Sequence, residues 1–234
     1  MKLAIMQPYF FPYIGYFQLM NAVDEFVVYD NIEFSKKGWI NRNRILVNGQ
    51  DVFITLSLRK DSDYLNINER YLAQVWPVES IKMLNRIIAA YRKAPYFESV
   101  FPIIEKSLLQ KEDNLFSFLL FTLKELKAHL SIKTPLVISS SIKIDHKLRS
   151  EDKVLEICKE RLGTEYINPI GGLSLYEKAR FSANGILLRF LRADEIIYPQ
   201  FNNSFVPWLS IIDVMMFSSI DEMKVMLQRK FTLE

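Results

Sequence analysis

Short apolar runs separated by polar loops give the start of the chain its pattern. Residues 2–6 and 26–29 are apolar runs of strand length, and the apolar stretch at residues 14–23 has the length of one helix. A strand that returns as a strand after one helix is typical of a right-handed βαβ unit. The proline- and aromatic-rich loop at residues 7–13 follows the first strand. Because open parallel sheets bind ligands at the carboxyl ends of their strands, we expect this loop to lie over a binding site.

The next segment is polar and then becomes β-rich. Residues 31–44 mix polar, charged and aromatic residues without a helical or strand period. Two β-rich runs follow, at residues 45–47 and 52–58, on either side of Asn48-Gly49. A type I′ turn needs positive φ at both central residues, so Asn-Gly between two such runs predicts a β-hairpin.

A helical block is predicted from residue 78 to about residue 132. Apolar side chains recur there with the helical period, as at Leu84 and Ile88. We expect Pro95 and Pro102 to divide the block into separate helices. The block would be an insertion between two halves of an α/β domain.

The last third alternates between strands and helices. Ser150 is expected to cap a helix that has acidic residues in its first turn, and Gly163 and Gly185 to follow helix ends. Strands are predicted at residues 136–138, 165–169 and 186–191, and helices from residue 150, at 173–184 and at 210–230. This alternation implies a parallel sheet. We therefore predict a single α/β domain, residues 1–234, with a mainly parallel sheet of βαβ units, an inserted β-hairpin and the helical block.

Composition narrows the class of protein. Half of the 234 residues are hydrophobic and 13% are aromatic, enough for a substantial core. The net charge is only +3, with Lys and Arg spread evenly, which argues against a nucleic-acid partner. No apolar run approaches the ~18 residues of a membrane span, and the N-terminal segment lacks the features of a signal peptide. We expect a cytoplasmic protein.

The usual catalytic and cofactor motifs are absent from the sequence. Cys158 is the only cysteine, so internal disulfides are excluded, and its apolar helical context predicts a buried structural thiol. The two histidines, His129 and His146, are not clustered as metal ligands are. No phosphate-binding loop, dinucleotide fingerprint or Gly-x-Ser-x-Gly elbow occurs. We expect no metal site and no tightly bound cofactor.

The first candidates for chemistry follow the first strand. Gln7 comes directly after it, and Tyr13-Ile14-Gly15-Tyr16 opens the first helix. Gly15 permits a close approach by backbone or ligand, and free amides at a helix N-terminus can hold an anion. The alternative is that Tyr13 and Tyr16 are core or rim aromatics.

The second candidate segment is residues 36–44. Its cations, amides and indole can bind phosphates and stack on a ring; they are Lys36, Lys37, Trp39, Asn41, Arg42, Asn43 and Arg44. An exposed charged run is usually a solvated face. Solvated faces seldom carry a tryptophan and interleaved asparagines, so we favour a functional interpretation.

Two more candidate segments lie in the last third. The glycine pair of Asn168-Pro169-Ile170-Gly171-Gly172 follows a strand, and its backbone amides, ahead of Tyr176, can form either an anion-binding nest or a tight turn. The other segment holds Gln200 and Asp213. Because Asp213 sits in an apolar run, its carboxylate must be paired or exposed. It is either a first-turn acid after Ser210 or a general base.

These segments, in this order, resemble the WbqC-like family over nearly the whole chain. Proteins of this kind occur in bacterial O-antigen and other surface-polysaccharide clusters, and a glycine-transferase role has been proposed for some. The resemblance implies N-acylation of an amino sugar but no assigned catalytic residue. It is carried by residues 5–16 and 38–45, by Tyr166-Ile167-Asn168 with residues 171–176, and by residues 198–200, 205–207 and 209–213.

A weaker resemblance concerns the turn at Tyr13-Ile14-Gly15-Tyr16. It looks like the His-x-Gly-His turn of nucleotidyltransferases and carboxylate-activating ligases, in which two histidines stabilise the transferring phosphate. Tyr13 and Tyr16 occupy both histidine positions here. Tyrosine donates a hydrogen bond but carries no positive charge at neutral pH, which puts adenylyl transfer by this turn in doubt.

The leading hypothesis is an acyl- or aminoacyltransferase, glycyl transfer included, that modifies a nucleotide-linked amino sugar. The donor would be an acyl thioester, with an acyl carrier protein as a possible partner, or an adenylate made from ATP. Arg42 and Arg44 would hold a diphosphate, Trp39 or Tyr13 would stack on a ring, and Gln7 with the Gly171-Gly172 amides would stabilise the oxyanion. The alternatives are a non-catalytic subunit that binds a sugar nucleotide, and an ATP-dependent carboxylate-activating or nucleotidyltransferase-like enzyme.

The predicted roles divide the candidates into two groups. Those assigned to catalysis are Gln7, Tyr13, Tyr16 and Asp213, and those assigned to substrate binding are Pro8, Gly15, Lys36, Trp39, Asn41, Arg42, Asn43, Arg44, Asn168, Gly171, Gly172, Tyr176 and Gln200.

Overall fold

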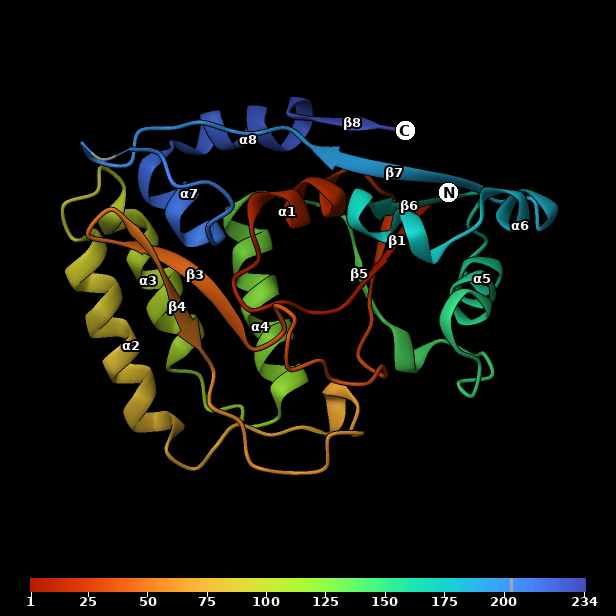
Figure 1. Ribbon diagram of the computed structural model, residues 1–234, viewed down its shortest axis with the longest axis horizontal. Helices are drawn as coiled ribbons and strands as arrows, with labels where there is room; N and C mark the ends of the chain where they lie inside the picture. The colour runs from red at the N-terminus through yellow and green to blue at the C-terminus, as the bar shows by residue number, and fades with distance from the viewer. Residues whose placement is uncertain (203) are drawn as a thin grey trace.

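A computed structural model describes residues 1–202 and 204–234, and a six-stranded sheet forms its centre (Figure 1). Neighbouring strands are parallel, except that the last strand runs antiparallel to its neighbour. The strands lie in the order β5 (Leu136–Ile138), β2 (Glu25–Val28), β1 (Lys2–Met6), β6 (Glu165–Pro169), β7 (Leu187–Ala193), β8 (Phe231–Leu233). The prediction of a mainly parallel α/β sheet is confirmed.

The five parallel strands follow the chain order 3-2-1-4-5, as in doubly wound sheets. The predicted βαβ unit is present, because α1 (Ile14–Asn21) connects β1 to the parallel β2. From β6 the chain turns the other way, through α6 (Lys178–Ala183), to β7. The carboxyl ends of β1 and β6 therefore form the switch point of the sheet, where ligands bind in this architecture.

Both faces of the sheet are covered, so the side chains of β1 alternate between two apolar clusters. Ala4 lies in the larger cluster, with α1, the helical block, α7 (Ile211–Phe217) and α8 (Ile220–Arg229). Leu3 and Ile5 lie in the smaller cluster, with α5 (Ser150–Glu160) and α6. Figure 1 shows α5 and α6 on one side of β1 and β6 and α1 on the other.

The predicted hairpin is formed by β3 (Arg42–Val47) and β4 (Gln50–Thr55). Asn48 and Gly49 take φ of 51° and 77°, as a type I′ turn requires. Strand β3 begins three residues earlier than the apolar pattern indicated. Three polar residues, Arg42, Asn43 and Arg44, therefore belong to a strand rather than to a loop.

The helical block consists of α2 (Trp76–Tyr91), α3 (Phe97–Leu108) and α4 (Leu115–His129). Pro95 separates α2 from α3 as predicted, but Pro102 lies inside α3, so the prediction that it divides two helices is wrong. The buried face of α3 compensates for the missing amide hydrogen bond. The second helix boundary lies instead just before Asn114. The Asn114 side chain accepts from Ser117 N at 3.1 Å and caps α4.

Helix ends in the last third differ from the sequence predictions. Ser150 is the first residue of α5, with φ of 46°, rather than its N-cap. Leu162, with φ of 56°, takes the left-handed position assigned to Gly163. Gly163 is needed for another reason, because a Cβ there would lie 2.3 Å from a methyl carbon of Leu3. Gly185, with φ of 72°, follows α6 in the left-handed conformation, as predicted.

Two predicted helices are divided. The helix expected at residues 173–184 is a 3-10 segment, η3 (Ile170–Leu175), followed by the short α6. The helix expected at residues 210–230 ends after α7, because Ser219 forms a capping box with Glu222 and starts α8. Two further 3-10 segments are η1 (Ile67–Glu69) and η2 (Ser139–Ser141).

Two findings bear on the predictions from composition. Cys158 is buried, and burial raises the pKa of its thiol to about 12, so the thiol stays protonated at neutral pH as a structural cysteine does. Within residues 1–202 and 204–234, no helix has both the length and the apolar character needed to cross a membrane.

Candidate functional site

Hydrogen bonds join three of the four candidate segments beside the N-terminus of α1. Asn43 Nδ2, on β3, donates to the carbonyls of Phe10 and Phe11 at 3.0 and 2.8 Å. Ser210 Oγ, which precedes α7, donates to the Phe11 carbonyl at 2.8 Å, and Ser210 N donates to the Arg44 carbonyl at 2.9 Å. The loop after β1, the start of β3 and the entry to α7 are therefore held in one arrangement.

These segments surround a small pocket of about 160 Å³, which we call the aromatic slot. Trp39 and Trp208 are 38% and 50% exposed. Tyr13 stands edge to face against Trp208 at 6.0 Å, and the Arg44 guanidinium lies 5.6 Å from the Trp39 ring. The lining residues are Tyr9, Pro12, Tyr13, Trp39, Asn43, Arg44 and Trp208. Aromatic walls with one cationic group suit a ligand that presents a ring and polar substituents.

Two bulky residues at or next to the slot have a strained backbone. Phe11 and Trp208 both take positive φ, 42° and 58°. Bulky residues seldom occupy this region, and each such residue costs on the order of 1–3 kcal/mol. The Trp208 carbonyl accepts from Arg44 Nη2 at 3.3 Å, which helps to hold the strained residue.

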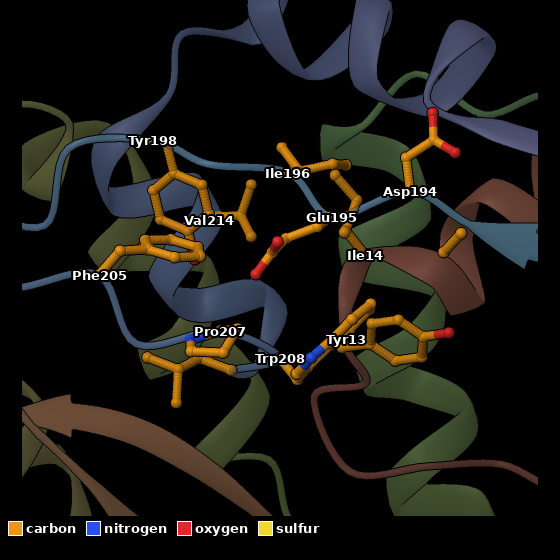
Figure 2. Close-up of a pocket in the computed structure, with 12 residues that line it drawn as sticks. Tyr13, Ile14, Asp194, Glu195, Ile196, Tyr198, Phe205, Pro207, Trp208 and Val214 are labelled. Atoms are coloured by element: carbon orange, nitrogen blue, oxygen red, sulfur yellow. The ribbon is translucent and has the colours of Figure 1, made fainter.

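A second, smaller hollow of about 30 Å³ shares Tyr13 and Trp208 with the slot (Figure 2). Figure 2 shows the Glu195 carboxylate pointing into this hollow, whereas the carboxylate of Asp194 points away. Both residues directly follow the carboxyl end of β7. Among the described residues, the Glu195 carboxylate has no hydrogen bond or ion pair. It is therefore free to contact a ligand.

Beneath the slot, a buried network surrounds Asp213. Its carboxylate accepts from Tyr91 Oη at 2.7 Å, Tyr198 Oη at 2.8 Å and Gln200 Nε2 at 2.6 Å. The Tyr91 hydroxyl in turn accepts from Leu46 N at 2.8 Å. Burial raises the pKa of Asp213, although the three donated hydrogen bonds oppose this. The sequence predicted that Asp213 is either paired or exposed. Asp213 is fully buried, so the paired alternative is the correct one.

A comparison with known protein families finds a family whose matched range contains all four candidate segments. The family model described as the WbqC-like protein family matches residues 7–225. The chain belongs to this family. It is also 26% identical, over 219 residues and 92% of each chain, to an uncharacterized protein of Mycobacterium tuberculosis, Rv1507c. No solved structure is significantly similar to this WbqC-like chain.

Several candidates of this WbqC-like chain support the loop before β3 instead of lining the slot. Arg42 donates to the carbonyls of Lys37 and Gly38 at 2.9 and 3.2 Å, so its guanidinium is engaged within its own segment. Asn41 Nδ2 donates to the Leu56 carbonyl at 3.1 Å. Lys36 forms an exposed ion pair with Asp63. Of residues 36–44, the slot receives only Trp39, Asn43 and Arg44.

The residues that follow β1 are arranged around Tyr16. The Tyr16 hydroxyl is buried, and it donates to the Gln7 carbonyl at 3.1 Å. Burial raises the pKa of both Tyr13 and Tyr16, so both remain neutral at physiological pH. Pro8 is buried, whereas the Gln7 side chain is partly exposed and its amide makes no hydrogen bond with the described residues. Gln7 lies at the switch point but does not line the aromatic slot.

The close approach predicted at Gly15 is made by Tyr13. A Cβ on Gly15 would lie 2.3 Å from the Tyr13 ring, so the ring folds over the start of α1. Gly15→Ala should therefore displace the ring and alter the slot, while the free energy of unfolding changes by less than ~1 kcal/mol because alanine favours the helix. Urea unfolding measures stability, and the near-ultraviolet circular dichroism of the aromatic rings reports the displacement. Unchanged aromatic signals would contradict this geometry.

The remaining candidate segment, residues 168–176, lies away from the slot, at the carboxyl end of β6. Asn168 Nδ2 donates to Tyr166 Oη at 2.7 Å, and a Cβ on Gly172 would lie 2.0 Å from Asn168 Oδ1. Gly172 therefore packs tightly, whereas Gly171 has open space where a Cβ would be. Tyr176 lines a separate cleft at the carboxyl edge of the sheet. Gln200, placed with the substrate-binding residues, is buried beside Asp213 and also accepts from Val206 N at 2.7 Å.

Sequence reasoning missed Trp208 and Glu195 as candidates. Trp208 stands between two stretches that carry the family resemblance, yet the sequence pattern assigns it no role. Glu195 had a usable signal, because an acidic residue directly after a strand of a parallel sheet lies at the ligand-binding edge.

Proposed function

We propose that this chain transfers an acyl or aminoacyl group, such as glycyl, to the amino group of a nucleotide-linked sugar in surface-polysaccharide biosynthesis. The aromatic slot is the observation that supports this best, because its exposed indoles and Arg44 suit a polar ring. Pockets for drug-sized ligands measure about 300–1,000 Å³, so a slot of about 160 Å³ fits one ring rather than a whole nucleotide sugar.

The proposed chemistry uses residues at the two adjoining hollows. The sugar amine attacks the acyl carbonyl, a C–N bond forms, and either the C–S bond to a carrier breaks and its thiolate leaves, or the C–O bond of an acyl adenylate breaks and AMP leaves. Glu195 takes the proton that the amine loses. Arg44 lines the slot and supplies its guanidinium there, while its Nη1 also pairs with Asp51 at 2.8 Å. Tyr13 and Trp208 hold the ring between these two groups.

One observation favours a second candidate, a non-catalytic sugar-nucleotide-binding subunit. Gln7, Tyr16 and Asp213, three of the four residues predicted to be catalytic, do not line the slot. The two candidates differ in turnover. Purified chain would be incubated with a UDP-linked amino sugar and, separately, an acyl-CoA, an acyl carrier protein thioester, or glycine with ATP. Mass spectrometry of the sugar detects transfer. Binding without transfer from every donor would favour the second candidate.

Trp208→Ala should weaken binding of the amino-sugar ligand about tenfold or more, because truncation of a central aromatic contact typically costs at least ~1–2 kcal/mol. Isothermal titration calorimetry measures the dissociation constant. Tyr64→Ala is the matched control, since Tyr64 is 84% exposed and lies outside the slot. Equal affinities of the two variants would remove the slot from the proposed function.

A further inference from the structure

A larger cleft lies at the carboxyl edge of the sheet, with a volume of about 670 Å³. We call it the carboxyl-edge cleft. It is lined by residues 29 and 31–33 after β2, by residues 174–176 after β6, and by residues 146, 148–151 and 153–154 around the start of α5, with Asn66 beside them. Its volume is within the range of small-ligand pockets, about 300–1,000 Å³, and its position is where open α/β sheets bind ligands.

One wall of this cleft carries positive charge. Arg149 is exposed, and among the described residues its guanidinium has no hydrogen bond or ion pair. Lys153 is only 4% exposed, and its Nζ donates to the Asn31 carbonyl at 3.0 Å. This contact uses one of three ammonium donors. Arg149 is the N-cap residue of α5 and Lys153 lies near the start of that helix, so the two cations line the cleft from the same helix end.

The carboxylates that line the cleft leave Arg149 unpaired, whereas Asp30, which lies behind the lining, attracts the Lys153 ammonium. Glu151 accepts from Arg180 Nη1 at 2.8 Å and from Glu177 N at 2.9 Å, so it is paired outside the cationic wall. Glu33 is exposed, lines the cleft in the segment after β2, and forms no ion pair with either cation. Arg149 therefore remains the cation without a carboxylate partner among the described residues.

Neutral polar and aromatic groups complete the cleft. Asn31 Nδ2 donates to His146 Nδ1 at 2.9 Å, which leaves His146 Nε2–H free to donate. Tyr29 has one ring face covered by Lys153 Nζ, 5.0 Å from its centroid. Tyr176 is half-buried and also lines the cleft. The cleft thus offers cations, N–H donors and a second aromatic ring.

We infer that the carboxyl-edge cleft binds the phosphate groups of a nucleotide, with Arg149 and Lys153 as the cationic contacts and Tyr176 beside the base. The arginine fork and the ammonium match phosphate oxygens. This inference rests on the proposed function for the source of the nucleotide, which would be the diphosphate of the sugar nucleotide. An ATP co-substrate presents the same chemistry, so the experiment distinguishes the two sources.

The test is calorimetric titration of the full chain with UDP, ADP and pyrophosphate at low salt. Arg149→Ala should weaken UDP or ADP binding about 10- to 100-fold, since a hydrogen bond to a charged group contributes roughly 1.5–3 kcal/mol. Lys147→Ala is the matched control, because Lys147 is exposed, two residues away and outside the cleft. Lys153→Met should also weaken nucleotide binding. Because Lys153 is buried, this substitution can perturb folding, and Arg149→Ala then serves as the test.

The outcomes separate this inference from the transferase proposal. A preference for UDP over ADP identifies the sugar nucleotide as the source, and the reverse identifies ATP; both support the cleft. Equal nucleotide affinity in Arg149→Ala and Lys147→Ala overturns the inference, as does the absence of binding of all three probes. Loss of UDP binding in Trp208→Ala also overturns it, because the nucleotide would then lie in the slot. Nucleotide binding that depends on Arg149, without any acyl transfer, would overturn the proposed function but not the inference about the cleft.

Discussion

Asp213→Ala should lower the free energy of unfolding by about 3–5 kcal/mol, the typical loss when one partner of a buried charged network is removed. The substitution leaves the Tyr91 hydroxyl, the Tyr198 hydroxyl and the Gln200 amide without their buried acceptor. Each orphaned donor costs roughly 1–3 kcal/mol. Since domains are stable by only about 5–15 kcal/mol, the urea midpoint should fall markedly at unchanged m-value.

A matched control is Asp221→Ala, which removes an exposed carboxylate paired only with Lys224 among the described residues and should change the midpoint little. The tyrosine partners provide a finer test. Tyr91→Phe should cost more than Tyr198→Phe, because Tyr91 Oη also accepts from Leu46 N and its loss leaves that buried amide unpaired. Equal midpoints for Asp213→Ala and Asp221→Ala would show that the network does not hold the structure together.

This network also explains how the slot is positioned. Through Tyr91 it reaches Leu46 on β3, the strand that carries Arg44. Through Tyr198 and Gln200 it fixes the segment that leads to Trp208. A buried acid on α7 therefore connects the two walls of the slot, although it touches no ligand position itself. We expect Asp213 to act on function by holding these walls.

Local patterns predicted much of the fold. The βαβ unit and the Asn48-Gly49 hairpin were recognisable because helix period, strand length and turn chemistry are short-range properties. Pro102 was misread because packing of α3 outweighs the local penalty of a proline. The polar start of β3 was missed because Asn43 is buried against backbone carbonyls, which no hydropathy pattern shows.

The site was predictable only in part, since it is assembled from distant segments. Tyr13, Trp39 and Arg44 were identified from residue type, and the structure brings them together. Their partner Trp208 can be recognised only when β3 and the entry to α7 are placed in space, whereas the position of Glu195 after β7 was a signal that could have been used. The positive charge of the carboxyl-edge cleft was not predicted either, because Arg149 and Lys153 look like ordinary surface charges of a helix in the sequence.

Glu195→Gln should lower kcat for acyl transfer by about 10²–10⁴-fold, the usual contribution of a positioned general base. The amide keeps the shape and polarity of the side chain but cannot take the proton from the sugar amine. KM should change little, since the walls of the slot are untouched. Steady-state kinetics with the donor found active in the transfer assay, and with the amino-sugar nucleotide varied, measures both constants.

Asp194→Asn is the matched control for this prediction. It removes the neighbouring carboxylate, which Figure 2 shows pointing away from the hollow, and should leave kcat within about twofold. Trp208→Ala provides the contrast on the binding side, because loss of a wall should raise KM more than it lowers kcat. If Glu195→Gln and Asp194→Asn retain equal kcat, the proton leaves the amine by another route and Glu195 has no part in the chemistry. A large loss confined to Glu195→Gln would instead make the hollow beside the slot the place where the C–N bond forms.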